Sequence, residues 1–436
     1  MKNFKTLFGM AVLGLMAAAC TNDVDEVLAP EAPLQGYHFI ATIAPKTSGA
    51  TTRTLLEEVK DGDDVSLSST WKVGDKIYIV YQASSSRAEV EAEVKEVSED
   101  GSATIEASFE KLPTSTDEQN AYLQYPITSK FDEQDGRLSS DRDLRYGWAT
   151  LKVDGEKVTF EGTPSLDAEG SIFKFTMVDF ENASINVDKL VISSKDYWDE
   201  DDGLTITVTP TAAASELYVT IPIPDTGSVH TFWFEATSGS SPYIAQATGS
   251  LEIGYYYQST LKMATVGNVI GADGAFYVDS DAASDASTTA EAMIAYLGSE
   301  AENAEHGLAI ALEDVKNGEI TTFEWATNTV VSNWESGHVV SDGKWCLPSV
   351  DYWMYIFQGC GGDKKAKLED GMRFSYGNFC DKLKAAGGEE ANVQSDNYWS
   401  ATGSSEDNAF VYDFNEAMFF GTEKAESHYV RAVLAF

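Results

Sequence analysis

Cysteine is scarce in this sequence, with four residues among 436: Cys20, Cys346, Cys360 and Cys380. Small secreted scaffolds that depend on disulfides are far richer in cysteine, so that class is excluded. The three cysteines near the C-terminus allow one disulfide at most, with one thiol left over. The domains must therefore fold on hydrophobic cores, with little covalent help.

Basic side chains are also few. The chain has 30 Lys and Arg against 70 Asp and Glu, a formal net charge of −40. Nucleic acid and anionic membrane surfaces repel such a chain, so we expect neither as a partner. Scattered acidic residues are typical of a solvated exterior. The hydrophobic fraction of 43% is that of globular domains, and the length suggests two or three of them.

Signatures of catalysis and of metal binding are missing as well. The sequence has no H-E-x-x-H pair, G-x-S-x-G elbow, phosphate loop or dinucleotide fingerprint. Residues 199–203 are rich in carboxylates but lack the alternating spacing of a calcium loop. Without a matched His, Cys346 and Cys380 fit buried apolar positions better than nucleophiles. We expect no catalytic residue, no metal and no cofactor.

The N-terminus has the features of a secretory signal. Lys2 and Lys5 precede an apolar run over residues 7–19, which is too short for a membrane span. Small residues then lead to Cys20, an arrangement that resembles a bacterial lipobox and implies that Cys20 is lipidated. The alternative is an ordinary secretory signal that ends near a cysteine.

Residues 21–35 are polar, acidic and proline-containing, which indicates a tether. Within it, Asp23, Asp25 and Glu26 resemble a surface-export signal of some Gram-negative bacteria. We therefore expect an outer-membrane precursor that touches the membrane only through its lipid and is exposed at the cell surface.

Residues 36–264 have the pattern of an all-β region, because no useful helical period appears before residue 280. Apolar residues alternate with Glu over 88–94, the period-two pattern of a half-buried strand. We predict further strands at 37–43, 76–81, 104–109, 121–126, 171–177, 189–193, 204–208, 217–223, 231–236 and 251–263. Short strands separated by turn residues favour β-sandwiches.

The order of three elements resembles fimbrillin-type pilins: an early strand, then W-x-x-G-D-x-I from Trp71 to Ile77, then Tyr125-Pro126. A purely structural interpretation of the middle element, a turn at Gly74-Asp75 beside a core Trp71, is compatible with it. The resemblance implies two transthyretin-like β-sandwiches. It also implies a lipoprotein precursor that a trypsin-like protease cuts after an Arg in the loop that follows the first strand.

Arg53, followed by Thr54, stands where that family would place the cut. In the family, loss of the first strand opens a groove that accepts a strand from the next subunit, so the resemblance implies other pilin subunits as partners through β-strand complementation. The alternative is an ordinary exposed Arg in a polar loop.

Beyond residue 264 the pattern changes to α+β. We predict helices at 290–297, 348–358 and 379–386, an apolar strand at 307–316 and a buried strand at 429–436. Trp345 to Pro348, Tyr398 to Thr402, and Tyr429 to Val433 together resemble a C-type-lectin-like module. The Glu-Pro-Asn and Trp-Asn-Asp motifs of calcium-dependent sugar binding are absent, so that activity does not follow.

In related modules the stretch between Tyr398 and Tyr429 forms the ligand face, and Tyr and Asn are adaptable contact residues. The resemblance therefore implies ligand contacts at Asn397, Ser404, Glu406, Asn408, Tyr412, Asp413, Asn415, Phe419, Glu423, Glu426 and His428. The alternative is that the aromatic residues are core and the others solvated loop.

The sequence thus predicts a mainly β chain: two transthyretin-like β-sandwich domains followed by an α+β C-type-lectin-like domain. The predicted bounds are 1–20 for the signal peptide, 21–35 for the tether, then 36–160, 161–264 and 265–436 for the domains. We expect a fimbrial subunit, at the tip or as an accessory cap, that presents its last domain to a glycan or protein. One alternative is a permanently anchored binding lipoprotein, and another is an enzyme on the lectin-like fold.

Overall fold

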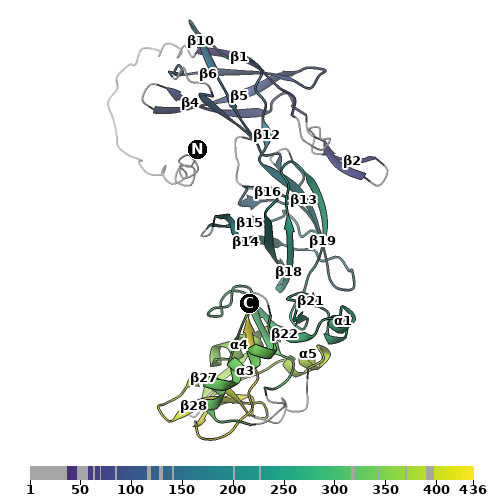
Figure 1. The fold of residues 1–436 in the computed structure, drawn as a ribbon, viewed down its shortest axis with the longest axis vertical. Coiled ribbons are helices and arrows are strands. Elements are labelled where there is room, and N and C mark those ends of the chain that lie inside the picture. Colours follow the sequence, from purple (N-terminus) through teal and green to yellow (C-terminus); the bar gives the residue numbers. More distant parts are fainter. Residues whose placement is uncertain are drawn as a thin grey trace, which may run out of the picture.

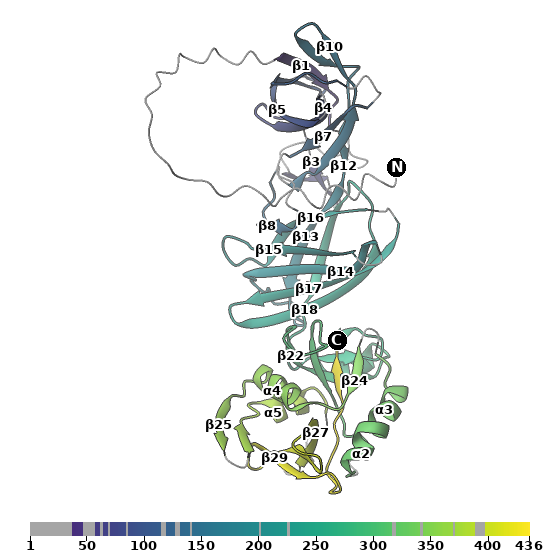
Figure 2. The same ribbon diagram turned by 90° about the vertical axis from the view of Figure 1, so that its left-hand side faces the viewer.

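The structure is a computed structural model that describes residues 37–46, 57–61, 64–68, 70–83, 86–114, 119–126, 131–139, 142–199, 202–224, 227–315, 320–340, 343–368, 371–388 and 397–436. Cys20, Arg53 and Thr54 lie outside these residues. Among the described residues, strands hold 50% and helices 11%, which confirms the mainly β class. Three β-rich units follow one another along the long axis (Figures 1 and 2). None of the helices in the described part has the length and hydrophobicity of a membrane span.

The first unit is a curved sheet of nine strands in the order β10-β11-β1-β6-β5-β4-β7-β9-β12. Its strands are β1 (Tyr37–Ile43), β4 (Lys76–Ala83), β5 (Ser86–Val97), β6 (Ala103–Phe109), β7 (Ala121–Tyr125), β9 (Arg145–Ala149), β10 (Leu151–Asp154), β11 (Lys157–Phe160) and β12 (Asp167–Ala168), beside a hairpin of β2 (Glu57–Asp61) and β3 (Asp64–Ser68). One hydrophobic cluster fills the inside of the curve. In β5 the predicted alternation holds, with Ala92 and Val94 fully buried, Glu89 and Glu91 exposed and Glu93 half-buried.

The second unit is a sandwich of a three-stranded sheet, β16-β13-β19, and a five-stranded sheet, β18-β17-β14-β15-β8. Its strands are β8 (Glu133–Gln134), β13 (Gly170–Val178), β14 (Lys189–Asp199), β15 (Asp202–Val208), β16 (Glu216–Pro222), β17 (Val229–Ser238), β18 (Ser241–Ser250) and β19 (Tyr256–Lys262). Phe173, Phe175 and Met177 share the buried face of β13, as their spacing predicts. Strand β18 was not predicted, because its residues are mostly small and polar and only Ile244 and Ala245 are buried.

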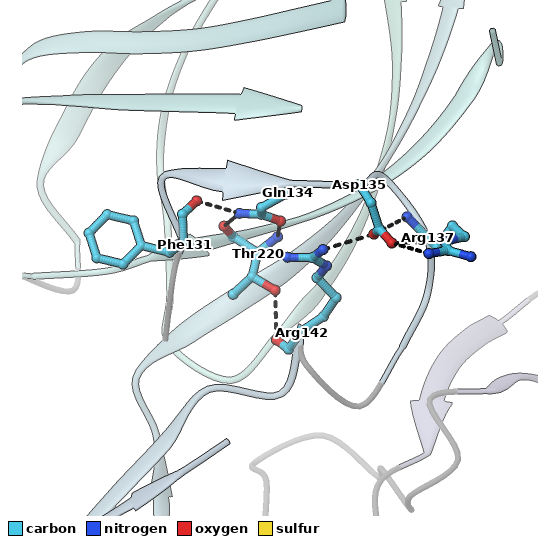
Figure 3. A network of polar contacts seen from close by, with 6 residues as sticks. All are labelled: Phe131, Gln134, Asp135, Arg137, Arg142 and Thr220. Atoms are coloured by element: carbon cyan, nitrogen blue, oxygen red, sulfur yellow. Dashed lines mark hydrogen bonds and ion pairs between the residues drawn. The ribbon is translucent and has the colours of Figure 1, made fainter. Parts of the chain in front are cut away.

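The first two units are joined by a shared segment, residues 131–139. Its strand β8 pairs in parallel with β15 of the second unit, although it precedes β9 of the first. The buried Gln134 side chain donates to the carbonyl oxygen of Thr220 at 2.8 Å and accepts from the Thr220 amide at 3.0 Å (Figure 3). Gly136 has a φ of +71°, and a Cβ there would lie 2.5 Å from Leu217 Cδ2, so this contact requires glycine.

The third unit has two sheets, β21-β20-β22-β23-β30-β24 and β25-β26-β29-β28-β27, with helices packed against them (Figure 2). Its strands are β20 (Val269–Gly271), β21 (Phe276–Tyr277), β22 (Ala290–Leu297), β23 (Gly307–Ala311), β24 (Lys344–Cys346), β25 (Lys364–Leu368), β26 (Gly371–Phe374), β27 (Asn397–Gly403), β28 (Asn408–Asp413), β29 (Met418–Glu423) and β30 (Val433–Ala435). Its helices are α1 (Ser280–Asp285), α2 (Phe323–Trp325), the π-helical stretch η3 (Ala326–Val330), α3 (Val331–Gly337), α4 (Val350–Gly359) and α5 (Phe379–Ala385).

One predicted helix of this unit is wrong. Residues 290–297 form strand β22, in which five consecutive residues from Glu291 to Ala295 are buried. A strand covered on both faces has a continuous apolar run, which periodicity cannot distinguish from a buried helix. The predicted helices at 348–358 and 379–386 are confirmed as α4 and α5. The helical segment from Phe323 to Gly337 was not predicted.

A buried ion pair ties the C-terminal strand to the rest of the third unit. Arg431 Nε donates to Asp314 Oδ1 at 2.7 Å, and the Tyr398 hydroxyl donates to Asp314 Oδ2 at 2.9 Å. Arg431 also donates to the carbonyl oxygens of Ala311 and Leu312. Two of the segments that resemble the lectin-like module therefore meet on one carboxylate in the core.

The second and third units meet through an aromatic contact. Trp233 of β17 stacks on His306 with ring centroids 4.0 Å apart, and it also contacts Phe276 and Phe436. Glu235 Oε1 lies 2.5 Å from His306 Nδ1. The contact thus combines ring stacking with an acid–imidazole hydrogen bond.

Asp135 should make stability depend on acid. Burial raises the pKa of Asp135, but hydrogen bonds from Arg142 and Arg137 outweigh it and hold the value at about 2, against an ordinary 3.8 (Figure 3). As pH falls, the unfolded chain binds this proton first, so the stabilisation present above pH 3.8 is lost on the way down to about pH 2. Urea unfolding of wild type and Asp135→Asn should converge over that window, whereas an unchanged gap would contradict this role.

Removal of one partner of the buried ion pair should be costly. Arg431→Met leaves the Asp314 carboxylate buried without its cation, so we expect a loss of about 3–5 kcal/mol. Tyr398→Phe removes one hydrogen bond and should cost about 1 kcal/mol. Urea unfolding followed by tryptophan fluorescence measures both. Lys152→Ala, in the exposed pair with Glu161, is the control and should change nothing measurable; similar losses for Arg431→Met and Lys152→Ala would contradict the assignment.

Candidate functional site

Strand β1 lies between two neighbours inside the first sheet. It pairs antiparallel with β6 along its whole length, from Tyr37 opposite Phe109 to Ile43 opposite Ala103. On its other side it pairs in parallel with β11, at His38 and Phe39. We call the position between β6 and β11 the β1 seat. A strand in this position supplies hydrogen bonds that both neighbours need.

The inward side of β1 belongs to the core. Phe39 and Ile43 are fully buried, and Tyr37 and Ala41 pack against the same cluster. The Phe39 ring lies 5.2 Å from the Phe109 ring and 5.0 Å from the Phe160 ring. His38, Ile40 and Thr42 point outward and are exposed. This alternation fixes the register, because a slip by one residue would exchange the buried and exposed sets.

The W-x-x-G-D element holds the end of β1. The Trp71 indole donates to the carbonyl oxygen of Ala44 at 2.9 Å, and its ring meets Tyr125 edge to face at 5.2 Å. Gly74 has a φ of +95° in the turn that leads into β4. Trp71 is 2% exposed. The structural interpretation of this element, a turn beside a core Trp, is thus confirmed.

Sequence reasoning missed one residue of this region. Lys46 begins a stretch rich in Ser and Thr, yet the structure buries it at 6% exposure beside Trp71 and Tyr125. The residues around it come from three separate stretches of sequence, at 71–75, 125 and 143. No local pattern could have revealed the contact.

The residues predicted as ligand contacts in the third unit occupy two ends of one sheet. Ser404, Glu406, Asn408, Glu423, Glu426 and His428 gather where β27 turns into β28 and where β29 ends; for example, Asn408 pairs with Glu423 and Glu426 Oε2 lies 3.5 Å from His428 Nε2. Asn397, Asp413 and Asn415 lie at the other end, where Asn397 pairs with Asp413. Burial lowers the pKa of His428, although Glu426 opposes the shift.

Two predicted ligand contacts are corrected. Tyr412 is fully buried and Phe419 is 1% exposed, with their rings 4.8 Å apart. The Tyr412 hydroxyl donates to the carbonyl oxygen of Phe374 at 2.6 Å, inside the core. Neither side chain can reach a ligand on the surface, so for these two the core alternative is correct.

Cys346 and Cys360 offer no reactive thiol. No disulfide forms among Cys346, Cys360 and Cys380 in the part of the chain that the structure describes. Burial raises the pKa of Cys346 to about 11 and that of Cys360 to about 12, so both remain protonated at neutral pH. Within the described ranges, no group of three or more His, Cys, Asp and Glu side chains is arranged to hold a metal ion.

A scan against models of protein families found no match, and a search among curated proteins found none. Solved structures do match. A fimbrial protein from Bacteroides ovatus is 12% identical, with 92% of this chain and 99% of that chain covered and a TM-score of 0.30. A fimbrial assembly protein from Parabacteroides distasonis is 11% identical over 52% of this chain and 90% of that one, with a TM-score of 0.27. At these TM-scores the similarity is limited to general features of the fold.

Phe39 tests how much the first unit depends on β1. Phe39→Ala removes a ring from a filled core, so we expect a loss of about 3–5 kcal/mol in the unfolding free energy. Thr42→Ala on the exposed side of the same strand is the control and should leave stability nearly unchanged. Urea unfolding compares the two variants with wild type, and similar losses in both would contradict the inward packing of β1.

Proposed function

We propose that this chain is a cell-surface fimbrial subunit that assembles by exchange of a strand in its first unit and presents its third unit as an adhesion module. The observation that carries the proposal is the β1 seat. β1 is bonded on both sides and supplies Phe39 and Ile43 to the core, yet it is the N-terminal strand of the described chain and lies upstream of Arg53.

Removal of β1 would leave backbone groups of β6 and β11 without partners and an apolar groove open to water. Both defects favour binding of another extended strand, because main-chain hydrogen bonds supply affinity and alternate side chains supply specificity. In this proposal the lipidated Cys20 first holds the precursor at the outer membrane. A cut between Arg53 and Thr54 then frees β1 from the rest of the chain.

The third unit supports a terminal position in the fibre. Its strand β30 pairs with both β23 and β24, and Val433 and Leu434 are fully buried. This strand is therefore held in its own core and is not offered to a neighbour. We propose a tip or accessory position for the subunit.

The adhesion face we propose is the far end of the third unit. It is built on Ser404, Glu406, Asn408, Glu423, Glu426 and His428, which lie together and include exposed side chains, and its ligand is a glycan or a protein at another surface. The second candidate function is a permanently anchored binding lipoprotein with the same face. Survival of β1 in its seat at the cell surface would favour that candidate.

Limited proteolysis tests the proposal. Residues 21–436 treated with a low dose of a trypsin-like protease should be cut after Arg53, as mass spectrometry of the new N-terminus would show. The cut chain should stay folded and release its first segment only when a peptide of another pilin's donor strand is added. Arg53→Ala is the matched control and should remain uncut and bind no peptide. Protection of Arg53, or unfolding after the cut, would favour the anchored lipoprotein.

A further inference from the structure

Lys46 is a buried cation just beyond the end of β1. Its side chain has no exposed surface, and its ammonium lies 4.3 Å from the centroid of the Trp71 ring and 3.7 Å from that of Tyr125. Nζ is 3.2 Å from Asp143 Oδ2 and 3.9 Å from Asp75 Oδ2. Two aromatic faces and two carboxylates thus surround one ammonium, and we call these four residues the lysine socket.

The charges of the socket require a cation. Asp143 also accepts from Arg145 Nε at 2.8 Å, so this guanidinium is the second cation at the site. With Lys46 in place the four charges cancel, and without it one negative charge remains in a site shielded from water. Burial lowers the pKa of Lys46 to about 8 while Asp143 and Asp75 oppose the shift, so the amine is still an ammonium at neutral pH.

A short, fixed stretch of chain connects the β1 seat to the lysine socket. Ile43 is the last core residue of β1, and the Ala44 amide donates to the carbonyl oxygen of Pro164 at 2.9 Å. Trp71 therefore holds the chain twice, through its indole at the Ala44 carbonyl oxygen and through its ring at the Lys46 ammonium. Pro45 between them has a fixed φ, which limits how Lys46 can be placed.

We propose that the lysine socket is a recognition site for a primary ammonium on the strand that replaces β1. This inference rests on the proposed strand exchange. An incoming strand must carry a lysine three residues beyond its last core residue. Aromatic faces with carboxylates bind alkylammonium groups well, whereas a neutral or acidic residue leaves the buried carboxylates without compensation. The socket thus determines the register in which an incoming strand binds, and it selects strands that carry a lysine at this position.

A competition between two peptides tests the socket. The chain is cut after Arg53 and incubated with equal excess amounts of an isotopically heavy peptide of residues 37–53 and the same peptide with Lys46→Gln. Native mass spectrometry then counts the chains that carry each peptide. We expect the lysine peptide to be bound about 100-fold more, the order found when one partner of a buried ion pair is removed. Lys46→Glu should be bound less still.

Two controls separate the socket from the strand. A peptide with His38→Gln, a change on the exposed side of β1, should compete equally with the unchanged peptide. A chain with Asp143→Asn should show a smaller preference for lysine. Equal binding of the Lys46 and Gln peptides would overturn the socket and leave strand exchange intact. Binding of neither peptide to a cut, folded chain would contradict strand exchange itself, and the recognition role of the socket with it.

Discussion

The structure depends on one constraint: a strand inside a sheet must have a hydrogen-bonded neighbour on each side and a core under one face. β1 meets it in the first unit and β30 in the third. The two strands differ in what binds them to the chain. β30 is tied to its own unit by the Arg431–Asp314 pair and by Tyr398. The covalent link from β1 to the rest of the first unit runs through the segment that contains Arg53. In the proposed assembly, β30 is the permanent strand and β1 the replaceable one.

The charged residues fall into two groups, exposed acidic side chains and a few buried cations. Most of the 70 acidic residues have no cation to pair with, since there are only 30 Lys and Arg, and water screens them on the surface. Each of the buried cations described above pairs with a particular carboxylate. Arg431 holds the core of the third unit, Arg145 and Lys46 share the carboxylate of Asp143, and Arg142 holds Asp135.

Much of the β architecture is predictable from alternation and turn residues: β1 matches its predicted bounds, and β13 presents the predicted inward face. The failures have physical reasons. β22 is buried on both faces and loses its period, while β18 contributes backbone pairs more than apolar side chains. Two of the predicted ligand contacts, Tyr412 and Phe419, are wrong because tertiary contacts that sequence spacing does not encode bury them. Lys46 was missed for the same reason, since Trp71, Asp75, Tyr125 and Asp143 reach it from distant stretches.

The segment around β8 has a mechanical consequence. It belongs to the first unit by sequence, yet it adds a strand to the second sandwich and is fastened there by Gln134, with Tyr218 donating to the carbonyl oxygen of Gly136. A boundary of this kind resists bending and does not act as a hinge, because bending it must break several hydrogen bonds at once. Tension applied at the second unit would pass through this segment into the first unit, so backbone hydrogen bonds would share the load with the covalent chain across this boundary.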